Sequence, residues 1–160
     1  MTYPMVTRVA VQEKDFDIAE LEASILGGAH EEGAVASFTG YVRRVNEGRH
    51  IEALTLEHYP EMTERSIEQI LQQAGRRWPL LAAGVVHRVG TLSPGDKVVW
   101  VGVSSGHREA AFQACEFVMD YLKTRAPFWK KEQGPDGAKW VSARGSDDAR
   151  AARWNARDDT

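Results

Sequence analysis

The chain has 160 residues, of which 42% are hydrophobic and 27% are charged, and its net charge is −3. This composition excludes disordered and fibrous proteins, and the negative charge gives no general support for nucleic-acid binding. A chain of this length forms one domain that buries about 70% of the surface of the unfolded chain. Because no run approaches the roughly 18 apolar residues of a membrane span and the N-terminus lacks a signal peptide, we expect a cytoplasmic protein.

The first elements in chain order are a strand and a short helix. Residues 6–11 alternate between apolar and polar side chains, as in a half-buried strand. Asp17 is a suitable N-cap for a helix over residues 18–26, which ends at the glycines 27–28. A second strand is predicted over residues 33–42.

A hairpin is predicted next. The sequence Asn-Glu-Gly at residues 46–48 is typical of a turn, and residues 51–58 alternate again. The pattern therefore pairs this strand with the strand over residues 33–42.

A helix and a second hairpin follow. The helix starts after Thr63 and is closed by Pro79. Its apolar side chains recur at helical spacing: Ile67, Ile70, Leu71, Ala74 and Trp78. Strand-like runs over residues 83–89 and 97–103 are joined by the turn Ser-Pro-Gly-Asp at residues 93–96, which predicts that they pair.

The next helix begins at Arg108 and ends before Pro127. It has an apolar stripe that we expect to lie on the sheet: Ala111, Phe112, Cys115, Val118, Met119 and Leu122. Cys115 is the single cysteine of the chain, so it cannot form an internal disulfide, and its place in the stripe predicts a buried, inert thiol.

A last hairpin is predicted from residues 128–132 and 139–143, which flank the turn Gly-Pro-Asp-Gly at residues 134–137. We expect one domain over residues 1–145 and a polar C-terminal tail over residues 146–160. Hairpins outnumber regular strand-helix-strand units. The predicted fold class is therefore α+β, with a mainly antiparallel sheet and two principal helices packed on it.

Basic side chains gather near the end of the second long helix, with no acid among them: Lys123, Arg125, Lys130 and Lys131. A lysine acts as a nucleophile or as an acid and base only when part of its population is neutral, which nearby positive charge or burial promotes. Lys123 and Lys130 are therefore candidate catalytic residues, and the alternative is a solvated basic turn. A second basic pair, Arg43 and Arg44, adds to a pattern that suits a small anionic ligand.

The segment Gly-Val-Ser-Ser-Gly at residues 102–106 matches the G-x-S-x-G motif of serine hydrolases. A hydrolase of that type needs a catalytic histidine late in the chain, and none follows His107, which is too close to Ser104 to act as its base. Two alternatives remain for this strand-to-helix junction. It is either a simple helix cap or an anion-binding turn that His107 and Arg108 would complete.

Metal binding is not predicted. The histidines at positions 30, 50, 58, 87 and 107 have no ligand spacing of a known kind. The sequence Glu57-His58-Tyr59 at a predicted strand end is more typical of a structural polar cluster than of a site.

Groups of residues along the chain resemble one known family. They are Gly33-Ala34, Phe38-Thr39-Gly40, Val42-Arg43, Leu56-Glu57-His58-Tyr59-Pro60 with Met62, His87-Arg88-Val89-Gly90, His107-Arg108, Ala111-Phe112, and MDYLKTRAPFWKKE from Met119 to Glu132. From about residue 6 to Trp154, the chain resembles the large subunit of molybdopterin synthase. The last run is highly specific, because a helix end, a proline break and an aromatic-basic strand are fixed together.

The resemblance implies an α/β-hammerhead fold and a homodimer at the centre of a heterotetramer, with one small ubiquitin-like subunit at each end. It also implies a reaction in which the partner's C-terminal Gly-Gly thiocarboxylate enters a pocket of the large subunit. There it gives sulfur to cyclic pyranopterin monophosphate, and two transfers form the dithiolene of molybdopterin. No cofactor is implied. A non-catalytic anion-binding module is the alternative, and the presence of both Lys123 and Lys130 favours the enzyme.

The resemblance also implies the site residues. The family's essential lysines fall on Lys123 and Lys130. Its substrate-binding positions fall on Tyr41, Val42, Arg43, His107, Arg108, Lys130, Lys131, Glu132 and Arg144. Arg144 matches an arginine that the dimer mate contributes. Tyr41 stands where some relatives have lysine, and Lys131 replaces an arginine, which keeps the charge but loses the bidentate fork.

Overall fold

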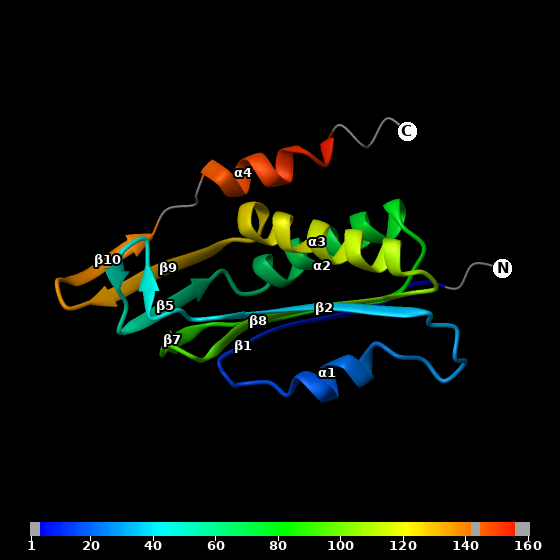
Figure 1. Ribbon diagram of the computed structural model, residues 1–160, viewed down its shortest axis with the longest axis horizontal. Helices are drawn as coiled ribbons and strands as arrows, with labels where there is room; N and C mark the ends of the chain where they lie inside the picture. The colour runs from blue at the N-terminus through cyan, green and yellow to red at the C-terminus, as the bar shows by residue number, and fades with distance from the viewer. Residues whose placement is uncertain (1–3, 142–144, 156–160) are drawn as a thin grey trace.

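The structure is a computed structural model that describes residues 4–141 and 145–155 (Figure 1). The helices are α1 (Ile18–Ser24), α2 (Met62–Arg77), α3 (Arg108–Arg125) and α4 (Gly145–Ala152). The strands are β1 (Val6–Gln12), β2 (Ala34–Tyr41), β3 (Val45–Asn46), β4 (Arg49–His50), β5 (Ala53–His58), β6 (Leu80–Arg88), β7 (Gly90–Leu92), β8 (Lys97–Ser105), β9 (Phe128–Gly134) and β10 (Gly137–Val141). The α+β class predicted from the sequence is confirmed.

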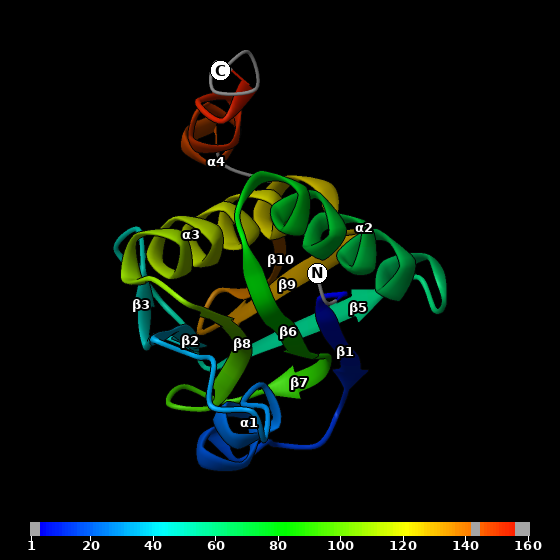
Figure 2. The same ribbon diagram turned by 90° about the vertical axis from the view of Figure 1, so that its right-hand side faces the viewer.

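The main sheet has the strand order β1-β6-β8-β2. Its strands β1 and β6 are parallel, whereas the other neighbours are antiparallel. The long helices α2 and α3 cover one face of this sheet and α1 covers the other (Figures 1 and 2). A second, antiparallel sheet with the order β10-β9-β5-β7 lies beyond one end of the main sheet, on the left in Figure 1.

The predicted hairpin between residues 33–42 and 51–58 is wrong. Strand β2 pairs with β8, with Ala34 opposite Ser105, whereas β5 pairs with β7 and β9 of the second sheet. The Asn-Glu-Gly turn closes only the short β3-β4 ribbon, where Glu47 and Gly48 have positive φ angles of 52° and 79°. A turn fixes the pairing of the residues beside it, and the longer strands then follow their own buried faces into different sheets.

The other two predicted hairpins are confirmed. Strand β6 pairs with β8, with Val85 opposite Val101, and β9 pairs with β10 across the predicted turn. Helix α2 buries the face that its spacing predicts, because Ile67, Ile70 and Leu71 are at most 2% exposed. Burying each of these side chains contributes about 1.5–3 kcal/mol.

Helix α3 differs from its predicted stripe. Phe112 is 66% exposed, whereas Phe117 and Tyr121, which lie outside the stripe, are buried. The reason is that α3 has three neighbours, namely the main sheet, α2 and α4 (Figure 2). A helix packed on several sides buries more than the single stripe that a helix on a sheet surface requires.

The segment that the sequence suggests as a polar tail contains helix α4, which lies on α3 (Figures 1 and 2). Just after this helix, Trp154 is 2% exposed and its indole N–H donates to Oδ2 of Asp120 over 2.7 Å. Arg153 also donates to Asp120 and to Glu116. Within the described part of the chain, no helix has the length and apolar character to cross a membrane.

Candidate active site

A cavity of about 530 Å³ lies where the end of the main sheet, the second sheet and the C-terminal end of α3 meet. This volume suits a small-molecule ligand. Its inner wall consists of buried apolar side chains from several elements: Val42, Ile51, Val98, Val99 and Leu122. Exposed side chains such as Tyr41, Arg43 and Lys123 also line it. The cavity therefore has an apolar inner end and a polar, cationic mouth, in which Arg43, Lys123 and Lys130 outnumber the acids Glu132 and Asp147.

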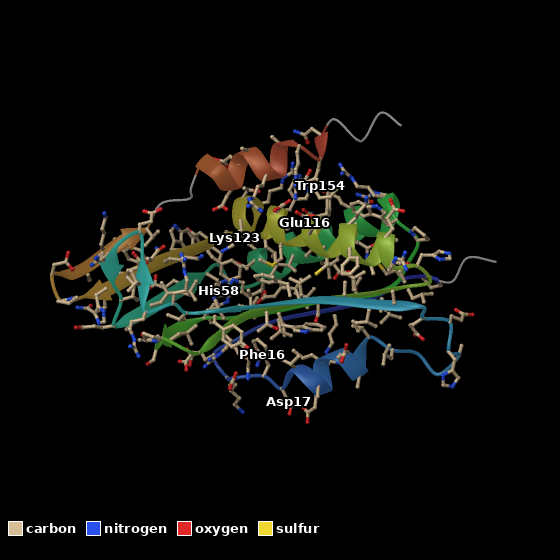
Figure 3. All side chains as sticks on the ribbon, viewed as in Figure 1. Phe16, Asp17, His58, Glu116, Lys123 and Trp154 are labelled. Atoms are coloured by element: carbon tan, nitrogen blue, oxygen red, sulfur yellow. The ribbon has the colours of Figure 1, made fainter. Side chains whose placement is uncertain are left out.

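Lys123 and Lys130 both line this cavity. Lys123 lies in the last turn of α3, at the end of the helix nearest the second sheet (Figure 3). Pro127 follows the end of the helix, and Thr63 donates its hydroxyl to the carbonyl oxygen of Pro127 over 3.3 Å. The chain then continues as β9, which carries Lys130. The proline break thus explains how two lysines seven positions apart in the sequence reach one cavity.

A hydrogen-bonded network links Glu132 to the mouth of the cavity. Glu132 is 8% exposed, and its Oε2 accepts a hydrogen bond from the amide nitrogen of Asn46 over 2.8 Å. The amide oxygen of Asn46 accepts in turn from Arg43 over 2.9 Å. Arg49 lies 3.5 Å from the other carboxylate oxygen of Glu132. The buried carboxylate therefore orients Asn46 and, through it, Arg43.

The structure brings only part of the predicted site together. Tyr41, Val42, Arg43, Lys123, Lys130 and Glu132 line the cavity. Lys131 does not, because successive side chains of a strand point to opposite faces, and its ammonium group lies 5.4 Å from the ring centroid of Trp140. Arg144 falls outside the described residues.

His107 and Arg108 are also absent from the lining of this cavity. They are exposed at the N-terminal end of α3, and Lys123 lies in the last turn of the same helix. At 1.5 Å per residue, the helix separates the two ends by roughly 22 Å. One chain alone cannot bring these residues to the same ligand.

His87 is a cavity residue that the sequence patterns do not mark as part of a site. It lies in β6, lines the cavity and is 7% exposed. The signal was a histidine directly after the apolar run of residues 80–86, because a buried polar group needs a local reason.

The remaining motifs do not supply catalytic groups. Ser104 is fully buried and its hydroxyl donates to the carbonyl oxygen of Ile25 over 2.8 Å, so it is unavailable as a nucleophile. Burial raises the pKa of the Cys115 thiol to about 12, which keeps it protonated and unreactive. Among the described residues, no three His, Cys, Asp or Glu side chains are grouped to hold a metal ion.

These features define a class of protein, an α+β domain whose basic cavity suits a small anionic ligand. The sequence family described as "MoaE protein" matches residues 11–125 of this chain. The chain is 54% identical over 148 residues to the molybdopterin synthase catalytic subunit of Salmonella typhimurium, covering 92% of this chain and 98% of that one.

Solved structures agree. The molybdopterin biosynthesis MoaE protein of Burkholderia ambifaria has a TM-score of 0.81 and 48% identity, over 94% of this chain and 99% of that chain. A complex of subunits 1 and 2 of molybdopterin-converting factor from Helicobacter pylori has a TM-score of 0.68 over 86% of this chain and 91% of that one, at 19% identity, which shows the fold alone. The chain therefore belongs to the MoaE family, the catalytic subunits of molybdopterin synthase in molybdenum cofactor biosynthesis. The resemblance identified from the sequence is confirmed.

Proposed function

We propose that this chain transfers sulfur from the thiocarboxylated C-terminus of a small partner subunit to cyclic pyranopterin monophosphate. The observation that carries the proposal is the convergence of Lys123 and Lys130 on one cavity with an apolar inner wall. The only cysteine of the chain, Cys115, is buried and protonated, which agrees with sulfur that arrives on a partner.

Each transfer forms one carbon–sulfur bond and breaks another. The thiocarboxylate sulfur bonds to an oxygen-bearing carbon of the substrate, and the carbon–oxygen bond there breaks, so that the oxygen leaves as water or stays on the phosphate. The acyl–sulfur bond then breaks as water or a lysine amine attacks the acyl carbon. With a lysine amine, the partner stays attached through an amide bond until water hydrolyses it. With water, the partner leaves as an ordinary carboxylate. Lys123 and Lys130 take part either by attacking that carbonyl or by moving the protons that the two steps require.

The partner that we propose is a small ubiquitin-like protein whose extended Gly-Gly end enters the cavity. A flexible tail without side chains reaches an inner end that a folded surface cannot enter, although ordering it costs binding energy. The Helicobacter pylori complex of two subunits on this fold supports such an assembly. We further propose the α/β-hammerhead arrangement and a heterotetramer with one partner at each end of a central homodimer.

Single-turnover conversion tests this proposal. The chain, mixed with thiocarboxylated partner and precursor, should form the dithiolene product, and mass spectrometry should detect the sulfur gained in each step. A partner that lacks its last two residues should bind with part of its affinity and support no turnover. Full activity with the truncated partner would sink the tail-insertion mechanism. Tight precursor binding without any conversion would favour the anion-binding module.

The homodimer offers a way to complete the anion site. Strand β2 is one of the two edge strands of the main sheet, and its two ends lie near different parts of the proposed site. Ala34 is opposite Ser105, beside the start of α3, whereas Tyr41 at the other end lines the cavity. Antiparallel pairing of two β2 edges about a two-fold axis would place one protomer's α3 N-terminus near its partner's cavity.

This arrangement assigns His107 and Arg108 to the cavity of the other protomer, where Arg43 meets the substrate phosphate, and the family resemblance adds Arg144. A helix N-terminus and guanidinium groups both favour such an anion. Arg108→Ala should weaken precursor binding without unfolding the protein, because the side chain is exposed. Unchanged affinity would remove Arg108 from the site.

Mixed dimers distinguish a shared site from a separate one. A dimer of one Lys123→Ala chain and one Arg108→Ala chain has one intact cavity if Arg108 acts in the other protomer. It should then show about half of the wild-type turnover below the KM for precursor, by the symmetry of the dimer. If Arg108 acts within its own chain, both cavities carry one substitution and the mixed dimer should be as poor as its parents.

A further inference from the structure

His87 has a fixed ring position at the junction of the two sheets. It comes from β6 of the main sheet, and its ring stacks on Phe128 of β9, with ring centroids 3.9 Å apart and an interplanar angle of 20°. Both rings line the cavity. Phe128 precedes Lys130 by two positions in β9, so the stack holds the imidazole on the same face as that lysine.

One nitrogen of the ring is already used. Nδ1 of His87 lies 2.8 Å from the carbonyl oxygen of Arg88. A carbonyl oxygen only accepts hydrogen bonds, so Nδ1 carries the proton and the neutral ring presents Nε2 as an acceptor. In the part of the chain that the structure describes, no group donates to Nε2, and this atom is not sealed from solvent. It is therefore open to the cavity.

The surroundings hold the ring in this neutral state. Burial lowers the pKa of His87 to about 3, opposed by its hydrogen bond to Arg88 and assisted by the positive charges of Lys130, Lys123 and His58. Because this pKa lies far below neutral, the ring is uncharged at any working pH. It is also too weak a base to take a proton from a lysine, whose ordinary pKa is about 10.4. His87 is thus a binding group and not a proton carrier.

The walls around His87 show what it would bind. Its cavity neighbours Val99, Leu122 and Phe128 offer apolar surface, and the oxygens of Glu132 are engaged by Asn46 and Arg49. A pterin is a flat heterocycle with N–H groups along its ring edge, and this substrate also carries a phosphate. We propose that Nε2 of His87 accepts a hydrogen bond from the pterin ring edge, while the phosphate lies at the cationic mouth. This inference rests on the proposed function and names the part of the site that recognises the ring.

Equilibrium binding of the precursor tests the inference without the partner or turnover. His87→Phe keeps a flat ring against Phe128 but removes the acceptor, and we expect it to raise the Kd for precursor about tenfold, the effect of one lost hydrogen bond. His87→Gln retains an acceptor and should recover most of the affinity. Inorganic phosphate probes only the cationic mouth. Its inhibition constant, measured by competition with the precursor, should be the same in all three proteins.

Nitrogen-15 spectra test the protonation state that the inference requires. The ring should remain the neutral Nδ1–H tautomer from pH 5 to 8. A ring that titrates near its ordinary pKa of about 6.5 would be a donor and would contradict the inference.

Three binding results would also overturn it. These are wild-type affinity in the Phe variant, equal weakness of the Gln and Phe variants, and a parallel loss of phosphate affinity, which would mean that His87 only supports the shape of the cavity. Failure of the wild-type protein to bind precursor would overturn this inference together with the proposed function. Binding by the wild type without sulfur transfer would overturn the proposed function alone.

Discussion

Replacing Lys123 with alanine should lower the single-turnover rate by about 10²–10⁴-fold or more, on the scale of losing an acid, base or nucleophile. The side chain is exposed in the last turn of α3 and lines the cavity. Its loss should therefore leave the fold and partner binding intact. Quenched single-turnover reactions with saturating partner and precursor measure this rate directly. A decrease of less than tenfold would assign the chemistry elsewhere, with Lys130 as the next candidate.

Lys123→Arg separates the possible roles of the amine. Arginine keeps the positive charge but does not lose its proton at working pH, so it can hold an anion and cannot act as nucleophile or base. If the arginine variant turns over at a near-normal rate, Lys123 only binds an anion and the proposed mechanism is wrong.

Arg125→Ala is the matched control for these two variants. Arg125 lies in the same helical turn, but its guanidinium group stacks on Tyr121, 4.0 Å from the ring centroid, and does not line the cavity. Its removal should change the rate by only a few-fold. A loss as large as that of Lys123→Ala would mean that the rate depends on general positive charge at this helix end.

Local patterns in the sequence predicted the parts of the fold that short-range physics determines. The helical spacing of Ile67, Ile70 and Leu71 predicted the buried face of α2, and Pro127 predicted the end of α3. The sheet that β5 joins does not follow from local patterns, because β5 pairs with β9, whose partner residues lie about 75 positions later. No local rule encodes that choice, so the turn at residues 46–48 suggested the wrong neighbour for β2.

The candidate site was predictable in part for a similar reason. The family resemblance pointed to Lys123, Lys130 and Glu132, and the fold brings these side chains to one cavity. The acceptor character of His87 was not predictable, because it arises from a stack on Phe128 of another sheet and from one backbone hydrogen bond. Periodicity shows that a residue is buried, but not what it touches across the interface between two sheets.

Trp154 is a second case in which a long-range contact matters, and its replacement should have a large effect on stability. Its ring forms edge-to-face contacts with Trp78 and Phe117, with centroids 5.5 Å away in each case, and it closes the main core from the α4 side (Figure 3). Its indole N–H also satisfies the buried carboxylate of Asp120. Nothing in the polar sequence around Trp154 indicated this role.

Trp154→Ala should lower the free energy of unfolding by about 3–5 kcal/mol, the range for removing a buried tryptophan. The matched control is Trp140→Ala, since Trp140 is 54% exposed on β10 and should cost less than about 1 kcal/mol. Urea unfolding of both variants, with equal m-values, measures the difference. Helix α4 also carries Asp147, which lines the cavity, so loosening this helix should raise the KM for precursor more than it lowers kcat. Equal midpoints for Trp154→Ala and the wild type would show that Trp154 contributes nothing to stability, and an unchanged KM would show that the cavity wall does not depend on its contacts.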